Sequence, residues 1–236
     1  MGDFQPTTTL PRPAGAPSPD WSKVTSFVSA GDVTWDTFPD LLTVEDDSLY
    51  LYPGTGDGKA DTPVKLGATG WARTDLLAPG DADGDGLADL WLRDGDSGDL
   101  FQILNSTDNP GNALGETDRR ARIAEGLTRA AHPQLGADGD LTGDDHGDLW
   151  IQTATGRPTI VAGQRDPAAG TVFRGPYPKA TLGDAAQRKG VKLSTSGDFN
   201  GDGKTDLISL WNNGRLALQD GNGTGGLSTP SNLVTP

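Results

Sequence analysis

The chain has 236 residues, with 33 acidic side chains against 19 basic ones and no cysteine. The formal net charge of −14 argues against nucleic acid and against an anionic membrane surface, because no basic stripe is present to neutralise phosphates. Without cysteine, disulfides, thiol chemistry and cysteine-ligated zinc are excluded. No run of 18 apolar residues predicts a membrane span, and 34 glycines with 17 prolines indicate many turns and little helix.

Residues 1–22 are rich in Pro, Thr and Ala, which predicts a linker or an extended arm. They contain no apolar core of the kind that a signal peptide needs. Because the chain starts at Met1-Gly2 directly ahead of this segment, we expect the natural protein to be longer, with an upstream domain joined at this point.

The remaining residues, 23–236, repeat one pattern four times, with predicted boundaries at about 23–71, 72–130, 131–189 and 190–236. Each repeat contains a nine-residue loop that begins with Asp after Gly and ends with Asp before Leu. The four loops start 49, 59 and 58 residues apart, which is about the length of a propeller blade. We number the loop positions 1 to 9 from the first aspartate, which is Asp32, Asp81, Asp140 and Asp198 in the successive repeats.

Every loop lies between two short strand candidates, such as "TDLLAP" before the second loop and "DLWLRD" after it. A third strand candidate and a weaker fourth one follow, the latter at Thr62–Gly67 in the first repeat. Four short strands with tight turns are typical of a propeller blade. The best helical candidate, Thr117–Leu127, is short, and we interpret it as a loop that runs into a fourth strand. The sequence therefore predicts an all-β fold, a β-propeller of four-stranded blades that is either four-bladed or part of a larger propeller.

The second loop, within "GDADGDGLADL", has the composition of a calcium site. Calcium prefers six to eight oxygen ligands, several of them carboxylates, and a glycine at position 6 permits the sharp turn around the ion. The expected ligands are the side chains of Asp81, Asp83, Asp85 and Asp89 with the carbonyl of Leu87. Magnesium fits less well because it gives up its water reluctantly. The alternative is that such segments are solvated Asp/Gly turns.

The same reasoning ranks the other three loops. The fourth keeps a glycine at position 6, the third has an aspartate there, and the first has no glycine at position 4 or 6 and a proline at position 8. We expect the second and fourth loops to bind calcium first and the first loop last. At position 7 only the backbone carbonyl is the expected ligand. The candidate ligands are Asp198, Asn200, Asp202, Lys204 and Asp206 in the fourth loop, Asp140, Thr142, Asp144, His146 and Asp148 in the third, and Asp32, Thr34, Asp36, Phe38 and Asp40 in the first.

The loop "DADGDGLADL" and its copies resemble the FG-GAP/VCBS repeat family, whose calcium-loop blades also build the integrin α-subunit propeller. The resemblance extends over residues from about 24 to 236. It implies blades around an axis, calcium between the first and second strand of each blade, and a secreted or cell-surface location. The sequence departs from the family pattern in two respects, since the Phe-Gly and Gly-Ala-Pro pairs are not clearly present and four repeats stand where the integrin type has seven.

No pattern in the sequence predicts an active site. The two histidines are His132, which opens a strand candidate, and His146, which lies at position 7 of the third loop. Nucleophile-elbow, zinc-protease and P-loop motifs are absent. We therefore expect a non-catalytic module that recognises a glycan or a protein. The alternatives are a hydrolase or lyase that uses two surface carboxylates and a purely structural spacer.

Three tryptophans follow the loops, at two different positions. Trp91 and Trp150 stand at position 11 in an apolar column, which predicts packing between blades. Trp211 stands at position 14, where the other repeats are polar, and Asn212 and Arg215 lie beside it. Since exposed aromatic side chains stack on sugars and anchor interfaces, we predict a recognition surface at Trp211, Asn212 and Arg215. The alternative is that Trp211 covers the linker or a neighbouring blade.

Overall fold

The computed structural model describes residues 21–137, 139–152, 158–166, 170–174, 192–195, 198–211 and 213–233. The regular structure of these residues consists of β-strands and three short 3-10 helices, without an α-helix, which confirms the all-β prediction. The helical candidate at Thr117–Leu127 forms the 3-10 helix η3 (Thr117–Arg119) and then strand β8 (Ala121–Ala124), as predicted. In this part of the chain, no helix has the length and apolar character needed to span a membrane.

The first two repeats each form one four-stranded antiparallel sheet in sequence order, β1-β2-β3-β4 and β5-β6-β7-β8. The short helix η1 (Trp21–Lys23) precedes the first sheet, and η2 (Asn112–Gly115) and η3 lie between β7 and β8. The strands of the first sheet are β1 (Val24–Gly31), β2 (Asp40–Glu45), β3 (Ser48–Tyr52) and β4 (Val64–Gly67); those of the second are β5 (Thr74–Gly80), β6 (Asp89–Asp94), β7 (Leu100–Ile103) and β8.

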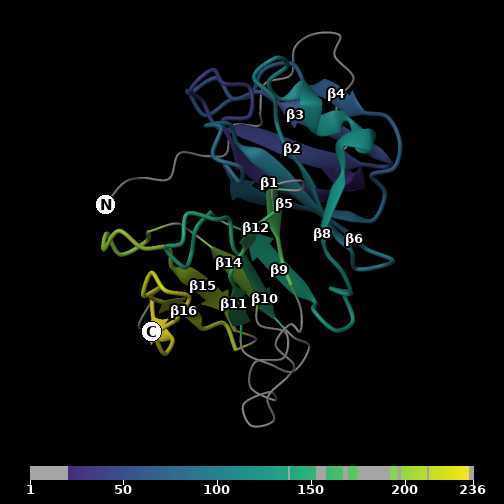
Figure 1. Ribbon diagram of the computed structural model, residues 1–236. Helices are drawn as coiled ribbons and strands as arrows, with labels where there is room; N and C mark the ends of the chain where they lie inside the picture. The colour runs from purple at the N-terminus through teal and green to yellow at the C-terminus, as the bar shows by residue number, and fades with distance from the viewer. Residues whose placement is uncertain are drawn as a thin grey trace.

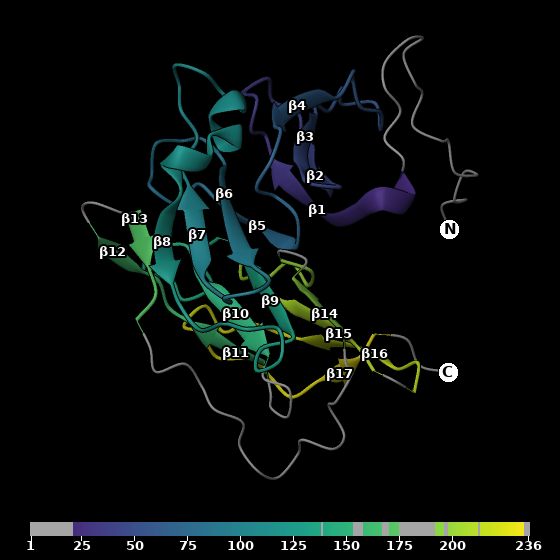
Figure 2. The same ribbon diagram turned by 90° about the vertical axis from the view of Figure 1, so that its right-hand side faces the viewer.

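The fourth repeat forms another four-stranded sheet, β14-β15-β16-β17, whereas the described part of the third repeat divides into two pieces. One piece is a three-stranded sheet in the order β11-β10-β9, and the other is the hairpin β12–β13. The hairpin lies beside β8 of the second sheet (Figure 2), where Phe173 N–H donates to the Ile123 carbonyl at 2.7 Å. The bounds are β9 (Gln134–Ala137), β10 (Leu149–Gln152), β11 (Pro158–Val161), β12 (Gln164–Asp166), β13 (Gly170–Val172), β14 (Lys192–Thr195), β15 (Leu207–Leu210), β16 (Leu216–Gln219) and β17 (Ser231–Asn232).

The hydrophobic core is divided into three clusters that lie between successive sheets. The first joins the sheets of repeats one and two around Leu42 and Leu90, and the second joins repeats two and three around Trp91 and Leu149. The third, smaller cluster joins repeats three and four at Trp150 and its neighbours. Each sheet thus buries its apolar residues against the next sheet in the chain, in the order that the colours follow in Figures 1 and 2. Trp91 and Trp150 are buried, as their packing role predicts.

Candidate functional site

The four nine-residue loops all connect the first and second strands of their sheets. In the first repeat, for example, β1 ends at Gly31 and β2 begins at Asp40, which is position 9 of the loop. This is the placement that the resemblance implies. The loops occupy corresponding places in the four sheets, and their internal contacts can be compared position by position.

The aspartate at position 9 is almost fully buried in every loop, with an exposed fraction of 2 % or less. Its Oδ2 accepts the backbone N–H of position 2, and its Oδ1 accepts a backbone N–H from the segment that follows the third strand, at 2.7 to 3.0 Å. One carboxylate therefore closes the loop and links it to the segment that follows the third strand of the same repeat. The four residues are Asp40, Asp89, Asp148 and Asp206, and the distant donors are Gly54, Asn105, Gly163 and Gly221.

The aspartates at positions 1 and 5 hold the turn of the loop together. In the second loop, Asp81 accepts N–H groups from Gly84, Asp85 and Gly86 at 2.7 to 3.1 Å, and Asp85 accepts the Leu87 N–H at 2.8 Å. In all four loops, position 1 accepts the N–H groups of positions 5 and 6, and position 5 accepts that of position 7. The backbone of each loop is consequently curled around its aspartates at positions 1 and 5.

Positions 4 and 6 have a positive φ in every loop, whether or not they are glycine. Glycines occupy both positions in the second and fourth loops, whereas the third has Asp145 at position 6 with φ 64°. The first loop has Trp35 at φ 63° and Thr37 at φ 79°. This conformation is costly for a β-branched residue. The first loop nonetheless follows the same path as the others, a result that the absence of glycine did not predict.

The second loop brings three carboxylates together in a group that could hold a metal ion. One carboxylate oxygen from each of Asp81, Asp83 and Asp89 lies within 4.8 Å of the others. The predicted ligand Asp85 is not in this group. Among the described residues, this is the one place where three such groups converge, and in the fourth loop an amide, Asn200, stands at position 3. The structure therefore supports the second loop as the strongest of the four candidates.

The electrostatics of the second loop favour neutralisation of its carboxylates. Burial, opposed by backbone hydrogen bonds and reinforced by the charges of Asp83 and Asp85, raises the pKa of Asp89 to about 7. Burial and the neighbouring charge of Asp85 also raise the pKa of Asp83. Both shifts show that the negative charges are poorly compensated by the protein alone. A bound cation is one means of compensating them.

In the other loops, the pKa shifts of the aspartates at positions 9 and 1 have opposite directions where a shift is resolved. Burial raises the pKa of Asp148 and of Asp40, against the backbone N–H groups that lower it. At position 1, backbone hydrogen bonds led by that of Gly203 lower the pKa of Asp198. The pKa of Asp140 is also lowered, because hydrogen bonds from four backbone N–H groups together outweigh the effect of its burial. In the third and fourth loops, the turn itself thus favours the charged form of the aspartate at position 1.

The sequence of the first two loops matches a known repeat. Residues 32–92 match the model of the FG-GAP-like repeat. This part of the chain is an FG-GAP-like repeat. The match begins at position 1 of the first loop and runs through the second loop into β6, so it contains the three converging aspartates. A comparison with curated proteins gave no match.

Two solved lectins resemble the fold in which the FG-GAP-like repeat is embedded. One is a lectin from Agrocybe aegerita, described by its specific recognition of non-reducing terminal N-acetylglucosamine, with 19 % identity and a TM-score of 0.54 over 86 % of this chain. The other is the BP39L lectin from Burkholderia pseudomallei, with 14 % identity and a TM-score of 0.54 over 89 % of this chain. The chain spans 50 % and 55 % of their respective lengths. At these identities the likeness concerns the fold.

The predicted recognition surface lies outside the FG-GAP-like repeat, at the turn between β15 and β16. The Arg215 guanidinium lies 5.3 Å from the centre of the half-buried Trp211 ring, and the Trp211 indole N–H donates to Ser209 Oγ at 3.1 Å. Arg215 also donates to the side chain of Asn232 and, at 2.7 Å, to the Pro230 carbonyl. Trp211 and Arg215 therefore lie close together, and the turn itself uses several of their donors. Asn212 lies outside the described residues.

His146 lies within the third loop, as its sequence position indicated, whereas His132 does not open a strand, since β9 begins two residues later at Gln134. The N–H of His146 donates to Asp144 at 3.1 Å within the third loop. The His132 carbonyl accepts a hydrogen bond from Arg93 at 2.6 Å, and burial together with the Arg93 charge lowers the pKa of the imidazole. His132 thus belongs to a structural network centred on Arg93, which the sequence did not reveal.

Proposed function

We propose that this chain is a calcium-stabilised β-propeller that acts as a non-catalytic recognition module, secreted or at the cell surface. The first strands β1, β5, β9 and β14 all contribute to the wall of one cavity, which supports blades arranged around a common axis. The division of the core into clusters between successive sheets supports the same arrangement. In this proposal the described chain supplies four blades.

The convergence of Asp81, Asp83 and Asp89 is the observation that carries the calcium assignment. An all-oxygen set rich in carboxylates matches calcium better than a transition metal, which takes nitrogen or sulfur ligands. Asp85 and the carbonyl of Leu87 would complete the set. A bound calcium ion would supply positive charge and cross-link positions 1 to 9 of the loop, so its role is structural. The fourth loop is the second candidate, with Asn200 contributing an amide oxygen.

Glycan recognition is supported by the resemblance of the fold to two lectins, one of which is described as recognising terminal N-acetylglucosamine. The pair of Trp211 and Arg215 adds an aromatic ring and a cation at a hairpin turn. Such a pair is suited to sugar rings and to polar protein surfaces. We place recognition at this turn and treat calcium as the element that holds the blades in shape.

Two measurements test the proposal. Calcium at 100 times its dissociation constant would stabilise the fold by about 2.7 kcal/mol per site. At about 2–4 °C for each kcal/mol, chelation with EGTA should lower the melting temperature by about 5–10 °C per filled site. Identical melts in calcium and in EGTA, with no calcium found by elemental analysis, would refute the calcium assignment.

A glycan array probed with the calcium-loaded protein tests recognition. Trp211→Ala should weaken the glycan signal by at least about fivefold, corresponding to about 1 kcal/mol, without a change of more than a few degrees in melting temperature. Binding that is unaffected by this substitution would assign Trp211 to packing. An array without any signal, in calcium and at high protein concentration, would leave protein recognition as the remaining form of the proposal.

A further inference from the structure

A cavity of about 340 Å³ lies where the first strands of the four repeats meet. Each repeat contributes to its wall the residue that stands four places before position 1 of its loop. These residues are equivalent in the repeats, so in the proposed propeller the cavity lies where the axis of the blades would pass. The four residues are Val28, Leu77, Gly136 and Ser194.

Trp150 also lines this cavity, and its indole N–H has no hydrogen-bond partner. The side chain is 4 % exposed, so the donor is buried. A β-carbon built on Gly136 would lie 2.2 Å from Trp150 Nε1, which places the N–H edge of the ring against this cavity-lining glycine. Among the buried side-chain polar atoms of the wall, within the described residues, Trp150 Nε1 alone lacks a partner.

The equivalent tryptophan of the second repeat shows how such a donor is satisfied when it serves packing alone. Trp91 pairs across the sheet with Gln102, and its indole N–H donates to Gln102 Oε1 at 2.8 Å. Trp91 is not part of the cavity wall. The residue opposite Trp150 is Ile160, which offers no acceptor. A buried donor without a partner costs stability, so an acceptor supplied by a ligand would remove this cost.

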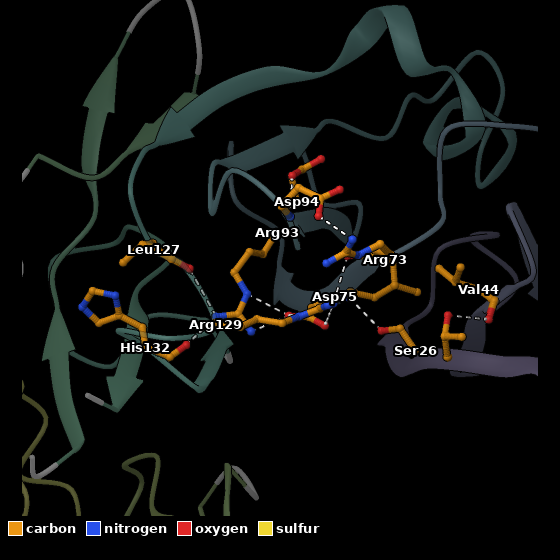
Figure 3. A network of polar contacts seen from close by, with 12 residues as sticks. Ser26, Val44, Arg73, Asp75, Arg93, Asp94, Leu127, Arg129 and His132 are labelled. Carbon is orange, nitrogen blue, oxygen red and sulfur yellow. Dashed lines mark hydrogen bonds and ion pairs between the residues drawn. The ribbon is translucent and has the colours of Figure 1, made fainter. Parts of the chain in front are cut away.

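The charged groups of the cavity wall neutralise one another (Figure 3). The buried Arg93 guanidinium donates to the Asp75 carboxylate, to the Leu127 carbonyl at 3.3 Å and to the His132 carbonyl at 2.6 Å. Arg129 donates to Asp75 from the other side at 2.7 Å. Beyond these groups, the negative charges of Asp94 and Asp96 act on Arg129, and Asp96 pairs with Arg73. Within the wall itself one guanidinium group, that of Arg93, faces one carboxylate, that of Asp75, so the lining carries no net formal charge and favours neither an anion nor a cation.

We propose that this axial cavity receives a single uncharged sugar residue, one of whose oxygens accepts the Trp150 indole N–H. This inference adds a second sugar site to the one proposed at Trp211, and it rests on the proposed function. Leu77 and Leu135 supply apolar wall for the C–H face of the ring, and Asp75 supplies carboxylate oxygens for hydroxyl groups. The volume lies at the lower end of the range of about 300–1,000 Å³ found for small-molecule pockets, which suits one ring and not an extended chain.

Nuclear magnetic resonance of the calcium-loaded protein tests the inference with free N-acetylglucosamine, galactose, fucose and mannose, and with glucuronic acid as a charged counterpart. The Trp150 indole N–H signal is identified by its loss in Trp150→Phe. At least one neutral sugar should shift this signal, and glucuronic acid should not. Trp150→Phe keeps an aromatic ring but removes the donor, so it should weaken binding about fivefold to tenfold. Trp91→Phe is the matched control and should leave the sugar affinity unchanged.

A second variant keeps the test decisive if Trp150→Phe does not fold. Ser194→Trp fills the cavity from β14, where Ser194 is exposed, and should abolish sugar binding while the protein still melts cooperatively in calcium. Sugar binding unchanged by both variants, or a Trp150 signal that no neutral sugar shifts, would overturn the inference and leave solvent as the only occupant. The array with Trp211→Ala is independent of this result, so glycan binding at the turn can hold while the axial site fails.

Discussion

The replacement Thr37→Gly should stabilise this protein although it removes a side chain. Thr37 stands at position 6 of the first loop with φ 79° and is exposed. Its backbone N–H donates to Asp32 at 2.7 Å, a contact that glycine retains. A left-handed conformation costs a non-glycine residue about 1–2 kcal/mol. Glycine loses about 0.5–1 kcal/mol through its greater freedom in the unfolded chain.

The net gain from Thr37→Gly is therefore about 0.5–1 kcal/mol. For a domain of this size, that corresponds to a rise of about 1–4 °C in the melting temperature. Gly86 in the second loop allows the reverse experiment, since it has φ 89° and a β-carbon built there meets no atom within 4 Å. Gly86→Thr should thus lower stability by a similar amount through the backbone alone.

Thermal unfolding of both variants in excess EGTA measures the backbone term without any contribution from calcium. A Thr37→Gly variant that melts below the wild type would refute the reasoning, because it would show that the first loop does not share the backbone of the second. A neutral result in both variants would mean that the cost of the positive φ at position 6 only equals the conformational entropy that glycine loses on folding. Repeating the melts in calcium then reports whether Gly86→Thr also weakens the second site.

Three further predictions follow from the loops and from the cavity wall. In Asp85→Ala and in Asp202→Ala, elemental analysis should find one calcium ion fewer than in the wild type. Each variant should lose more melting temperature in calcium than in EGTA, where only the hydrogen bond from position 7 to position 5 is lost. A normal ion content in either variant would reduce that loop to a turn. Trp91→Phe loses a buried hydrogen bond whereas Trp150→Phe loses none, so without sugar Trp91→Phe should melt about 2–4 °C lower than Trp150→Phe. Although burial opposes it, the two arginines lower the pKa of Asp75 below 3.8, so its stabilising contribution is complete above pH 3.8 and is lost as the pH falls through the folded-state pKa. The difference in urea midpoint between Asp75→Asn and wild type in EGTA should accordingly be constant well above pH 3.8 and should decrease as the pH falls below 3.8, and a difference independent of pH would contradict the assignment.

The two arginine partners of Asp75 have pKa shifts in opposite directions because they differ in burial. Burial lowers the pKa of Arg93 despite the attraction of Asp75, whereas the hydrogen bond to Asp75 raises that of the more exposed Arg129. A guanidinium group stays charged at neutral pH in either case. The pH dependence of this network therefore comes from the carboxylate.

Much of the fold could be predicted because the sequence marks each repeat with the same signal. The Asp-Leu pair at the end of each loop coincides with the start of the second strand, as at Asp89-Leu90, where β6 begins. The hairpin β12–β13 carries no such signal. Its place beside β8 depends on contacts between distant segments, such as the edge-to-face pair of Phe173 and Trp91 at 5.2 Å. Packing between segments far apart in the sequence is not visible in local patterns.

The ligand types of the candidate site could also be predicted, but the network around them could not. The second contact of position 9, from Asp89 to the Asn105 N–H, spans 16 residues and uses a backbone donor that any residue possesses. The sequence indicates the network of Asp75, Arg93 and Arg129 only weakly. Arg93 stands where the other repeats have Val44, Gln152 and Leu210, and a charged residue in such a column indicates a buried partner.

The first loop has the backbone conformation of the candidate metal site without all of its expected metal ligands. It lacks both turn glycines, yet Asp32 and Asp40 accept the same backbone N–H groups as their counterparts in the second loop. The buried Asp40 also ties the loop to Gly54 beyond β3, a contact that the sheet needs whether or not an ion is bound. Aspartates at positions 1, 5 and 9 therefore hold the loop whether or not an ion is bound, and position 3 reports more directly on ion binding. An aspartate at position 3, which the second loop alone has, is the feature that best distinguishes a calcium site from a turn of the same shape.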